Sequence, residues 1–168
     1  MSVLSYKSPD LESGEATVEI KIFPPPSVIQ LYNDKKEKVP TKKVIGLIDT
    51  GASKTAIDKN IASELNLIAR DMQKVLTPSG DSEHYLYDIV IVLENIKYLI
   101  PLQVFGAVLD KQPYDVLLGR DILRYCTLIY NGWNNSYDLH FHGIHGELIN
   151  NLYPNPNSHP LSPQKLRF

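Results

Sequence analysis

The sequence predicts an all-β domain with one or two short helices. Apolar and β-branched residues gather in short segments, such as residues 16–23 and 87–93, that have the length of strands. Proline, glycine, asparagine and aspartate residues, which are typical of turns, separate these segments. Helical signals are confined to a stretch after Asp58 and a short segment after Gly119. Strands this short at this spacing favour an all-β fold.

Composition limits the possible functions. With 168 residues, of which 43% are hydrophobic, the chain is long enough for one domain and too short for two. Its net charge of −2 argues against nucleic acid or an anionic membrane as a partner. The single cysteine, Cys126, excludes an internal disulfide, and we interpret it as a core residue rather than a nucleophile. Without an apolar run of membrane-spanning length or a signal peptide, a cytoplasmic protein is expected.

The N-terminal part is predicted to contain one strand between irregular segments. Residues 1–14 are polar without periodicity, so we expect a loose arm. Residues 16–23 alternate between apolar and polar, which predicts a half-buried strand. The prolines at residues 24–26 end this strand because proline donates no hydrogen bond to a ladder. The charged run at residues 33–38 is interpreted as a solvated loop.

Residues 44–53 form the most informative stretch of the chain. An apolar run ends there in Asp49-Thr50-Gly51. A buried strand that ends this way can hold a carboxylate rigidly in a poorly solvated place. The glycine lets the backbone turn sharply and point N–H groups back at the acid. This stretch is therefore a candidate for acid–base chemistry.

The middle of the chain predicts a short helix followed by strands. Asp58 can cap a helix whose two apolar residues, four positions apart, pack on one side. Residues 75–81 run from strand residues into a Pro-Ser-Gly turn, which is typical of a hairpin tip. Residues 87–93 and 96–105 are two further strands joined by a turn.

The last third of the chain predicts three strands and a tail. Residues 114–118 are an apolar strand that Gly119 breaks before a short helix. Residues 126–130 and 137–141 are predicted to be strands, and an Asn-Gly turn signal follows the first of them. The end of the chain is rich in proline and asparagine and shows no packing pattern. The expected organisation is an arm at 1–14, a domain at 15–142 and a tail at 143–168.

Three segments, in order, resemble the motifs of retropepsin-like aspartic proteases. They are similar to the active-site loop, to the turn of two apolar residues and glycine with its arginine-containing helix, and to the closing strand of that family. The matching residues are Asp49-Thr50-Gly51-Ala52-Ser53, Leu117-Leu118-Gly119-Arg120-Asp121 and Tyr125-Cys126-Thr127-Leu128. Asp-Thr-Gly alone is a weak signal, but the ordered set spans about residues 15–130 and is specific. The resemblance implies a closed, barrel-like retropepsin fold with one catalytic half-site per chain.

Because Asp-Thr-Gly occurs once, the resemblance implies a homodimer. Aspartic-protease chemistry requires two carboxylates that share one proton, one acting as base toward water and the other as acid toward the carbonyl. The second Asp49 then comes from an identical chain related by a twofold axis. The implied activity is peptide-bond hydrolysis on a peptide or protein substrate, with no metal and no organic cofactor.

The resemblance also implies roles for individual residues. Asp49 is the catalytic acid and base, Thr50 hydrogen-bonds across the twofold axis, and Gly51 brings backbone donors near the acids. The flap that closes over an extended peptide comprises Leu76, Thr77, Pro78, Ser79 and Gly80. The residues that support the site are Ala52, Ser53, Leu118, Gly119 and Arg120.

Two departures from the viral pattern leave questions open. Ser53 stands where viral enzymes often carry a second acid that pairs with the arginine of the later helix. The partner of Arg120 is therefore open between Asp121 and Asp58. The flap segment also lacks the multiple glycines of viral flaps, which leaves open how far it opens.

Two other functions remain as alternatives. In a strand, Asp138, His140 and His142 share one face and could bind a metal, as in a metal-dependent hydrolase, although a solvated strand face explains them as well. The chain could instead be a non-enzymatic dimerisation or peptide-binding domain with a protease fold. The intact Asp49 motif argues against that alternative, because paired buried acids cost folding energy.

Overall fold

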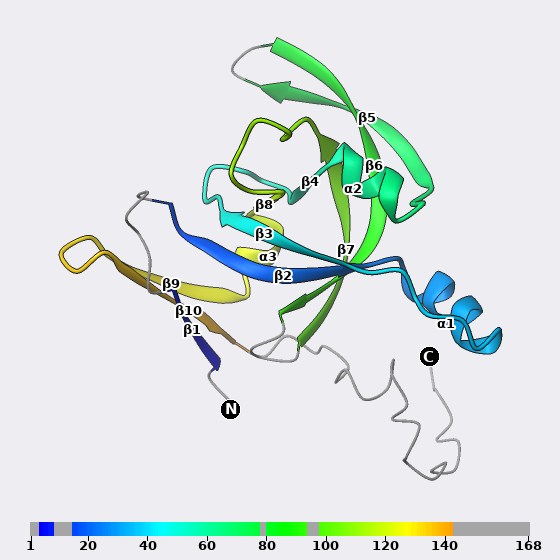
Figure 1. Ribbon diagram of the computed structural model, residues 1–168. Helices are drawn as coiled ribbons and strands as arrows, with labels where there is room; N and C mark the ends of the chain where they lie inside the picture. Colours follow the sequence, from blue (N-terminus) through cyan, green and yellow to red (C-terminus); the bar gives the residue numbers. More distant parts are fainter. Residues whose placement is uncertain (1–3, 9–14, 78–79, 94–97, 143–168) are drawn as a thin grey trace, which may run out of the picture.

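The protein is mostly β, as the sequence predicts (Figure 1). The computed structural model describes residues 4–8, 15–77, 80–93 and 98–142. The strands are β1 (Leu4–Ser8), β2 (Thr17–Phe23), β3 (Lys42–Ile48), β4 (Ala56–Asp58), β5 (Ala69–Thr77), β6 (Gly80–Leu93), β7 (Tyr98–Ala107), β8 (Val116–Leu118), β9 (Cys126–Asn131) and β10 (Ser136–Phe141). The helices are α1 (Pro26–Asp34), α2 (Lys59–Glu64) and α3 (Arg120–Leu123).

A closed barrel forms the body of the molecule. Its strands follow the order β2-β3-β8-β4-β7-β6, and β6 pairs back with β2. The pairs β3–β8 and β4–β7 are parallel, whereas the other neighbours are antiparallel. The alternation predicted for β2 is confirmed, because Val18, Ile20 and Ile22 are almost fully buried inside the barrel. The all-β, barrel-like fold that the resemblance implied is thus confirmed.

A second sheet, in the order β1-β10-β9, packs against the barrel. Its middle strand, β10, contributes Tyr137, Leu139 and Phe141 to the barrel core. The expectation of a loose N-terminal arm is wrong for Leu4–Ser8, which pairs with β10 along its whole length. The strand forms because its backbone groups hydrogen-bond to the edge of β10. Such pairing requires no alternation of apolar residues in the sequence.

The described residues contain three helices rather than one or two. The prolines at 24–26 end β2 as expected, but Pro26 also begins α1, where its missing N–H costs nothing. Ile29 of this helix packs with Phe23 and Val39 in a small second core. The segment at 33–38, interpreted as a loop, therefore begins inside a helix that continues to Asp34.

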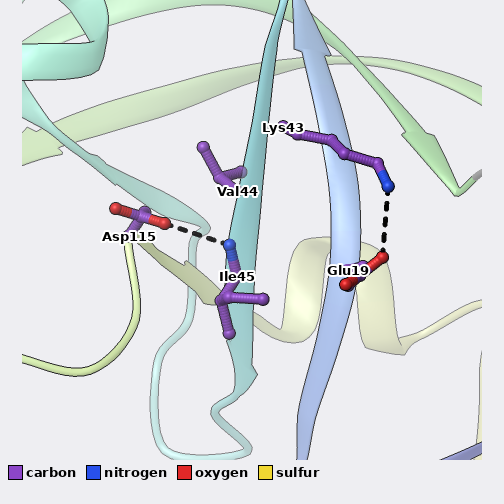
Figure 2. A pocket seen from close by; sticks show the side chains of 5 residues that line it. All are labelled: Glu19, Lys43, Val44, Ile45 and Asp115. Atoms are coloured by element: carbon purple, nitrogen blue, oxygen red, sulfur yellow. Dashed lines mark hydrogen bonds and ion pairs between the residues drawn. The ribbon is translucent and has the colours of Figure 1, made fainter.

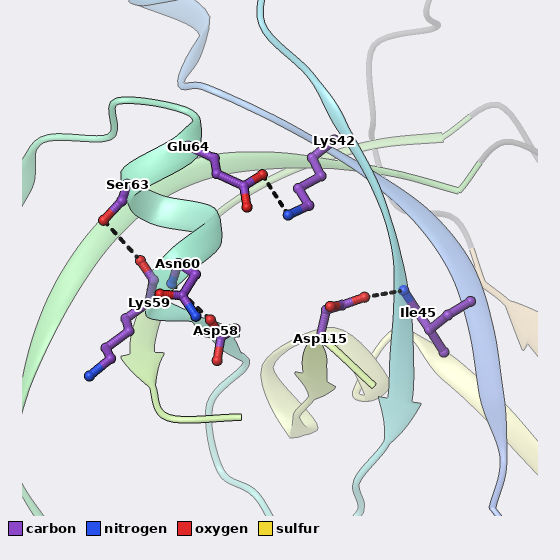
Figure 3. Close-up of polar contacts among 8 residues, drawn as sticks. All are labelled: Lys42, Ile45, Asp58, Lys59, Asn60, Ser63, Glu64 and Asp115. Carbon is purple, nitrogen blue, oxygen red and sulfur yellow. Dashed lines mark hydrogen bonds and ion pairs between the residues drawn. The ribbon is translucent and has the colours of Figure 1, made fainter. Parts of the chain in front are cut away.

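The helix predicted after Asp58 is confirmed as α2, and Asp58 is its N-cap (Figure 3). One carboxylate oxygen of Asp58 accepts from the backbone N–H of Asn60 at 2.8 Å, and the other from that of Leu109 at 2.7 Å. An ion pair between Lys42 and Glu64, at 2.5 Å, joins β3 to the end of this helix. The buried Asp58 thus connects the helix to the segment that precedes β8.

The predicted hairpins β5–β6, β6–β7 and β9–β10 are present. The turn residues Pro78 and Ser79, the turn at 94–97 and the tail at 143–168 lie outside the described residues. Among the helices of the described ranges, none has the length and apolarity that crossing a membrane requires.

Candidate active site

The Asp49 loop follows β3 and is held by β8. The N–H of Asp49 donates to the carbonyl of Leu118 at 3.0 Å, so the loop begins beside the last residue of β8. Asp115, just before β8, accepts from the N–H of Ile45 through its carboxylate at 3.0 Å. Its own N–H donates to the carbonyl of Ile45 at 2.8 Å. Figure 2 shows the bond between the Asp115 carboxylate and the N–H of Ile45, at a small pocket that also includes Glu19, Lys43 and Val44. These contacts fix β8 against β3 and so position Asp49.

The Asp49 carboxylate has one fixed and one open oxygen. Its Oδ1 accepts from the backbone N–H of Gly51 at 2.9 Å and from that of Ala52 at 3.2 Å. Within the described residues, no group donates to Oδ2. The side chain is half-buried, and Thr50 and Gly51 beside it are exposed. This geometry orients the acid and leaves one oxygen available to a water molecule or a second carboxylate.

Arg120 binds the carbonyl groups of the loop. Its Nη1 donates to the carbonyl oxygens of Thr50 at 3.0 Å and Gly51 at 3.2 Å. Its backbone N–H donates to the carbonyl of Ala52 at 2.9 Å. The partner of Arg120 is therefore the loop backbone, and neither of the two acids considered from the sequence. A guanidinium needs acceptors rather than a carboxylate specifically, so the loop tolerates Ser53, which is exposed, where viral enzymes often carry an acid.

A buried network under the loop joins it to α3. Thr55, which is fully buried, donates its hydroxyl to Asp121 Oδ1 at 2.7 Å and accepts from the N–H of Gly119 at 3.1 Å. The backbone N–H of Thr55 also donates to the Asp121 carboxylate, at 2.9 Å and 3.0 Å. The sequence analysis did not predict a role for Thr55, because a threonine between a lysine and an alanine matches no motif or periodicity.

Gly119 sits where two backbones touch. A Cβ on this residue would lie 2.5 Å from the carbonyl carbon of Lys54 and 2.8 Å from the N of Thr55. Real Cβ atoms essentially never approach other atoms so closely. The segment after the Asp49 loop and the start of α3 therefore pack together only because residue 119 has no side chain.

The candidate flap is the hairpin of β5 and β6. Leu76 and Thr77 end β5, and Gly80 begins β6 with a φ of +116°, which favours glycine. In the view of Figure 1 the end of β5, the start of β6 and the end of β3 lie toward the same side of the molecule. His84 lies within hydrogen-bond distance of the carbonyl of Gly106, at 2.8 Å, and attaches the base of the hairpin to β7.

The metal alternative involves Asp138, His140 and His142, of which Asp138 Oδ1 and His140 Nε2 are buried without a hydrogen-bond partner among the described residues. The described ranges contain no group of three or more His, Cys, Asp or Glu side chains that could hold a metal together. His142 instead lies 2.7 Å from the hydroxyl of Thr127. Cys126 faces the carbonyl of Ile122, and burial raises the pKa of its thiol to about 12, which fits a core residue rather than a nucleophile.

Comparison with known proteins identifies the family. Residues 38–125, more than half of the chain, match the family described as "gag-polyprotein putative aspartyl protease". No curated protein sequence matches. The crystal structure of a retropepsin-like aspartic protease from Rickettsia conorii is 17% identical over 83% of this chain and 92% of that one, with a TM-score of 0.55. EIAV protease complexed with the inhibitor HBY-793 is 19% identical over 66% and 86%, with a TM-score of 0.43.

The family match includes both the Asp49 loop and the turn at Gly119, which the structure joins by hydrogen bonds. The Rickettsia structure supports the fold independently, since its resemblance extends over most of both chains. The chain therefore belongs to the family of gag-polyprotein aspartyl proteases and has the retropepsin-like fold.

Proposed function

We propose that this protein is an aspartic endopeptidase that hydrolyses peptide bonds as a homodimer. The observation that carries the proposal is the Asp49 carboxylate, held by two backbone N–H groups on one oxygen and open on the other. A carboxylate in this state is oriented for acid–base chemistry and still accessible. Arg120 stabilises the loop that presents it.

The need for a second chain follows from the other acids near the loop. Asp121 is bound to Thr55, and both carboxylate oxygens of Asp58 accept backbone N–H groups. Asp115 is bound to the backbone of β3. Each of these carboxylates has a structural role, so none is free to act as the partner of Asp49. A second Asp49, from an identical chain, supplies the missing acid.

The proposed reaction uses both carboxylates and one water molecule. Two like charges in contact cannot both ionise, so the pair holds one proton. The ionised Asp49 removes a proton from water, whose oxygen attacks the peptide carbonyl, while the protonated Asp49 donates its proton to the carbonyl oxygen. The resulting diol collapses as the C–N bond breaks and the nitrogen gains a proton. No covalent intermediate and no cofactor are required.

The neighbouring residues have proposed positioning roles. Thr50, which is exposed in the loop, is proposed to hydrogen-bond with its counterpart in the second chain. The hairpin whose tip includes residues 76–80 is proposed to close over an extended peptide and exclude water. Residues 15–142, together with β1, form the proposed catalytic unit.

The decisive experiment mixes active and inactive chains. Asp49→Asn alone is expected to abolish cleavage of a mixed peptide library, whereas Asp110→Asn, a change at another exposed acid, is expected to keep it. At a fixed concentration of wild-type chain, a ninefold excess of Asp49→Asn is expected to lower activity about tenfold, because random pairing leaves few dimers with two acids. Unchanged activity in the mixture would contradict the shared site.

The alternatives predict different results. A metal-dependent hydrolase loses activity with a chelator and keeps it with pepstatin, whereas the proposed enzyme does the opposite. A peptide-binding domain forms dimers but cleaves no peptide from acidic to neutral pH. Activity that survives Asp49→Asn would reject the proposed mechanism outright.

A further inference from the structure

We propose that Lys54 binds an acidic side chain of the substrate, so that the enzyme prefers peptides with aspartate or glutamate within about five residues of the cleaved bond. The inference rests on the proposed peptidase function and deepens it by naming a class of substrate. It depends on the position of Lys54 beside the Asp49 loop, on the neutral groups that hold its ammonium, and on the lack of an acidic partner among the described residues.

Lys54 comes directly after the Asp49 loop. Its carbonyl carbon packs against Gly119, on which a Cβ would lie only 2.5 Å away. The next residue, Thr55, accepts the backbone N–H of Phe105 through its carbonyl at 3.0 Å, which places this segment beside β7. Five residues of chain span at most about 17 Å, so Lys54 stays near Asp49. An extended peptide bound at Asp49 covers the same distance with about five residues.

Neutral groups hold the Lys54 ammonium. Its Nζ donates to the side-chain carbonyl of Gln103 at 3.0 Å. The same nitrogen lies 5.0 Å from the centroid of the Phe105 ring, within the range of a cation–π contact. Gln103 and Phe105 flank Val104, which is fully buried in the barrel core, so their side chains lie on the opposite face of β7. The ammonium is therefore held against the outward face of β7.

The ammonium has no negative partner in the described part of the chain, where none of the ion pairs includes Lys54. Asp88, which lies in register with Gln103, is paired with Arg70. An ammonium can donate three hydrogen bonds, and the described residues accept one of them. Lys54 is half-buried, and a charge that is partly removed from water is costly without a counter-charge. The site therefore favours an anion that comes from outside the chain.

The hairpin of β5 and β6 reaches the same surface from the other side. The ring centroids of His84 and Phe105 are 5.8 Å apart, so the surface under Lys54 continues to the hairpin. His84 lies near the start of β6, which begins at Gly80. A peptide that lies between the Asp49 loop and this hairpin, as proposed above, passes Lys54. A carboxylate on that peptide can accept the donors that the chain leaves unused.

The twofold symmetry of the proposed dimer gives two such sites. Each chain contributes one Asp49 to the shared site, so the two copies of Lys54 stand on opposite sides of the cleaved bond. One copy binds an acid that precedes the bond, and the other binds an acid that follows it. Peptides with acidic residues on both sides should therefore be the best substrates.

The test compares matched peptides. Cleaved peptides from the mixed library are resynthesised with glutamate, glutamine or lysine at each nearby position on either side of the bond. With wild-type protein, glutamate should raise kcat/KM at least about tenfold over glutamine at one position on each side, chiefly through KM. Lys54→Met keeps the length of the side chain and should lose this preference. Lys54→Glu should transfer it to lysine peptides, because the amide of Gln103 can donate as well as accept.

Two further variants control for charge and for folding. Lys54→Arg keeps the positive charge and should keep the preference for glutamate, so it decides the result together with Lys54→Glu if Lys54→Met folds poorly. Lys59→Met removes the same charge from the exposed start of α2 and is expected to change nothing. Circular dichroism and unfolding temperature identify the variants that are folded. Added salt should weaken the preference of the wild-type protein, because it screens the ion pair.

The outcomes separate this inference from the proposed function. Equal cleavage of glutamate and glutamine peptides by wild-type protein, or a glutamate preference that persists in Lys54→Glu, overturns the inference and leaves the peptidase standing. If wild-type protein cleaves no peptide, the proposed peptidase fails and binding decides the inference. Fluorescence anisotropy is then measured with two labelled libraries that differ only in the replacement of every acidic residue by its amide. Tighter binding of the acidic library by wild type but not by Lys54→Glu supports the inference, and equal binding overturns it.

Discussion

Gly119→Ala is expected to damage both the fold and the site, because its added methyl group meets backbone on the facing segment. The Cβ would lie 2.5 Å from the carbonyl carbon and 2.8 Å from the carbonyl oxygen of Lys54, and 2.8 Å from the N of Thr55. Ordinary contact begins at 3.4 Å. A backbone cannot rotate away as a side chain can, so the two segments must separate by roughly 1 Å.

The size of the effect follows from this displacement. Overpacking a well-filled site costs about 1–3 kcal/mol, and a clash with backbone belongs at the upper end. For a chain of this length, about 3 kcal/mol lowers the unfolding temperature by roughly 6–12 °C. The same shift moves the start of α3, where Arg120 lies, relative to the Asp49 loop. A misplacement of about 1 Å in a catalytic group can reduce the rate about 100-fold.

Two other glycines give matched controls. A Cβ on Gly46 would lie 3.2 Å from side-chain atoms of Leu118, and one on Gly132 would lie 3.4 Å from the ring of Tyr130. Thermal unfolding should therefore rank the three alanine variants with Gly132→Ala least and Gly119→Ala most destabilised. If Gly119→Ala unfolds at the wild-type temperature and keeps full activity, the argument from backbone contact is refuted.

Two further predictions concern buried groups. Thr55→Val keeps the shape of the side chain but leaves the buried N–H of Gly119 without its acceptor, so urea unfolding should show a loss of about 2 kcal/mol. Thr55→Ser keeps the hydroxyl and should lose only about 1 kcal/mol for one methyl group, and equal losses would contradict the hydrogen-bond argument. Burial raises the pKa of Cys126 from 9.0 to about 12, so at pH 8 the thiolate is roughly a thousandfold scarcer than in the unfolded chain. Labelling with a thiol reagent should accordingly be slow in native protein and fast in urea, and equal rates would contradict it.

Sequence patterns predicted the elements whose stability comes from burying one face. The alternation in β2, and the spacing between Ile61 of α2 and Leu65 just after it, both reflect contact with the barrel core, which leaves a periodic signal. β1 gave no such signal, because it is stabilised by pairing with β10, and backbone hydrogen bonds do not depend on side-chain type. α1 was not predicted, because the prolines at 24–26 were interpreted only as the end of a strand. Proline can also begin a helix, as Pro26 does.

The sequence pointed to the Asp49 loop as the candidate site, but the contacts within the loop could not be predicted. Asp49 stands out in the sequence because it ends an apolar run and precedes a glycine, whereas the need for glycine at 119 comes from the facing backbone of Lys54 and Thr55. The contacts of Arg120 could not be read from sequence, because its acceptors are backbone carbonyls, which every residue possesses. Thr55 was missed for a related reason, since its importance lies in a hydrogen bond to a residue 64 positions away.

In the proposed homodimer, each Asp49 loop is held by residues of its own chain. Thr55, Asp121, Gly119 and Arg120 all act on the Asp49 loop from the same chain, so the loop can hold its geometry before any partner arrives. Variants of this network should therefore lower the stability of the monomer. If Thr55→Val weakened dimerisation without affecting unfolding, the loop would have to be ordered by the partner instead, and the idea of a loop that holds its geometry by itself would be contradicted.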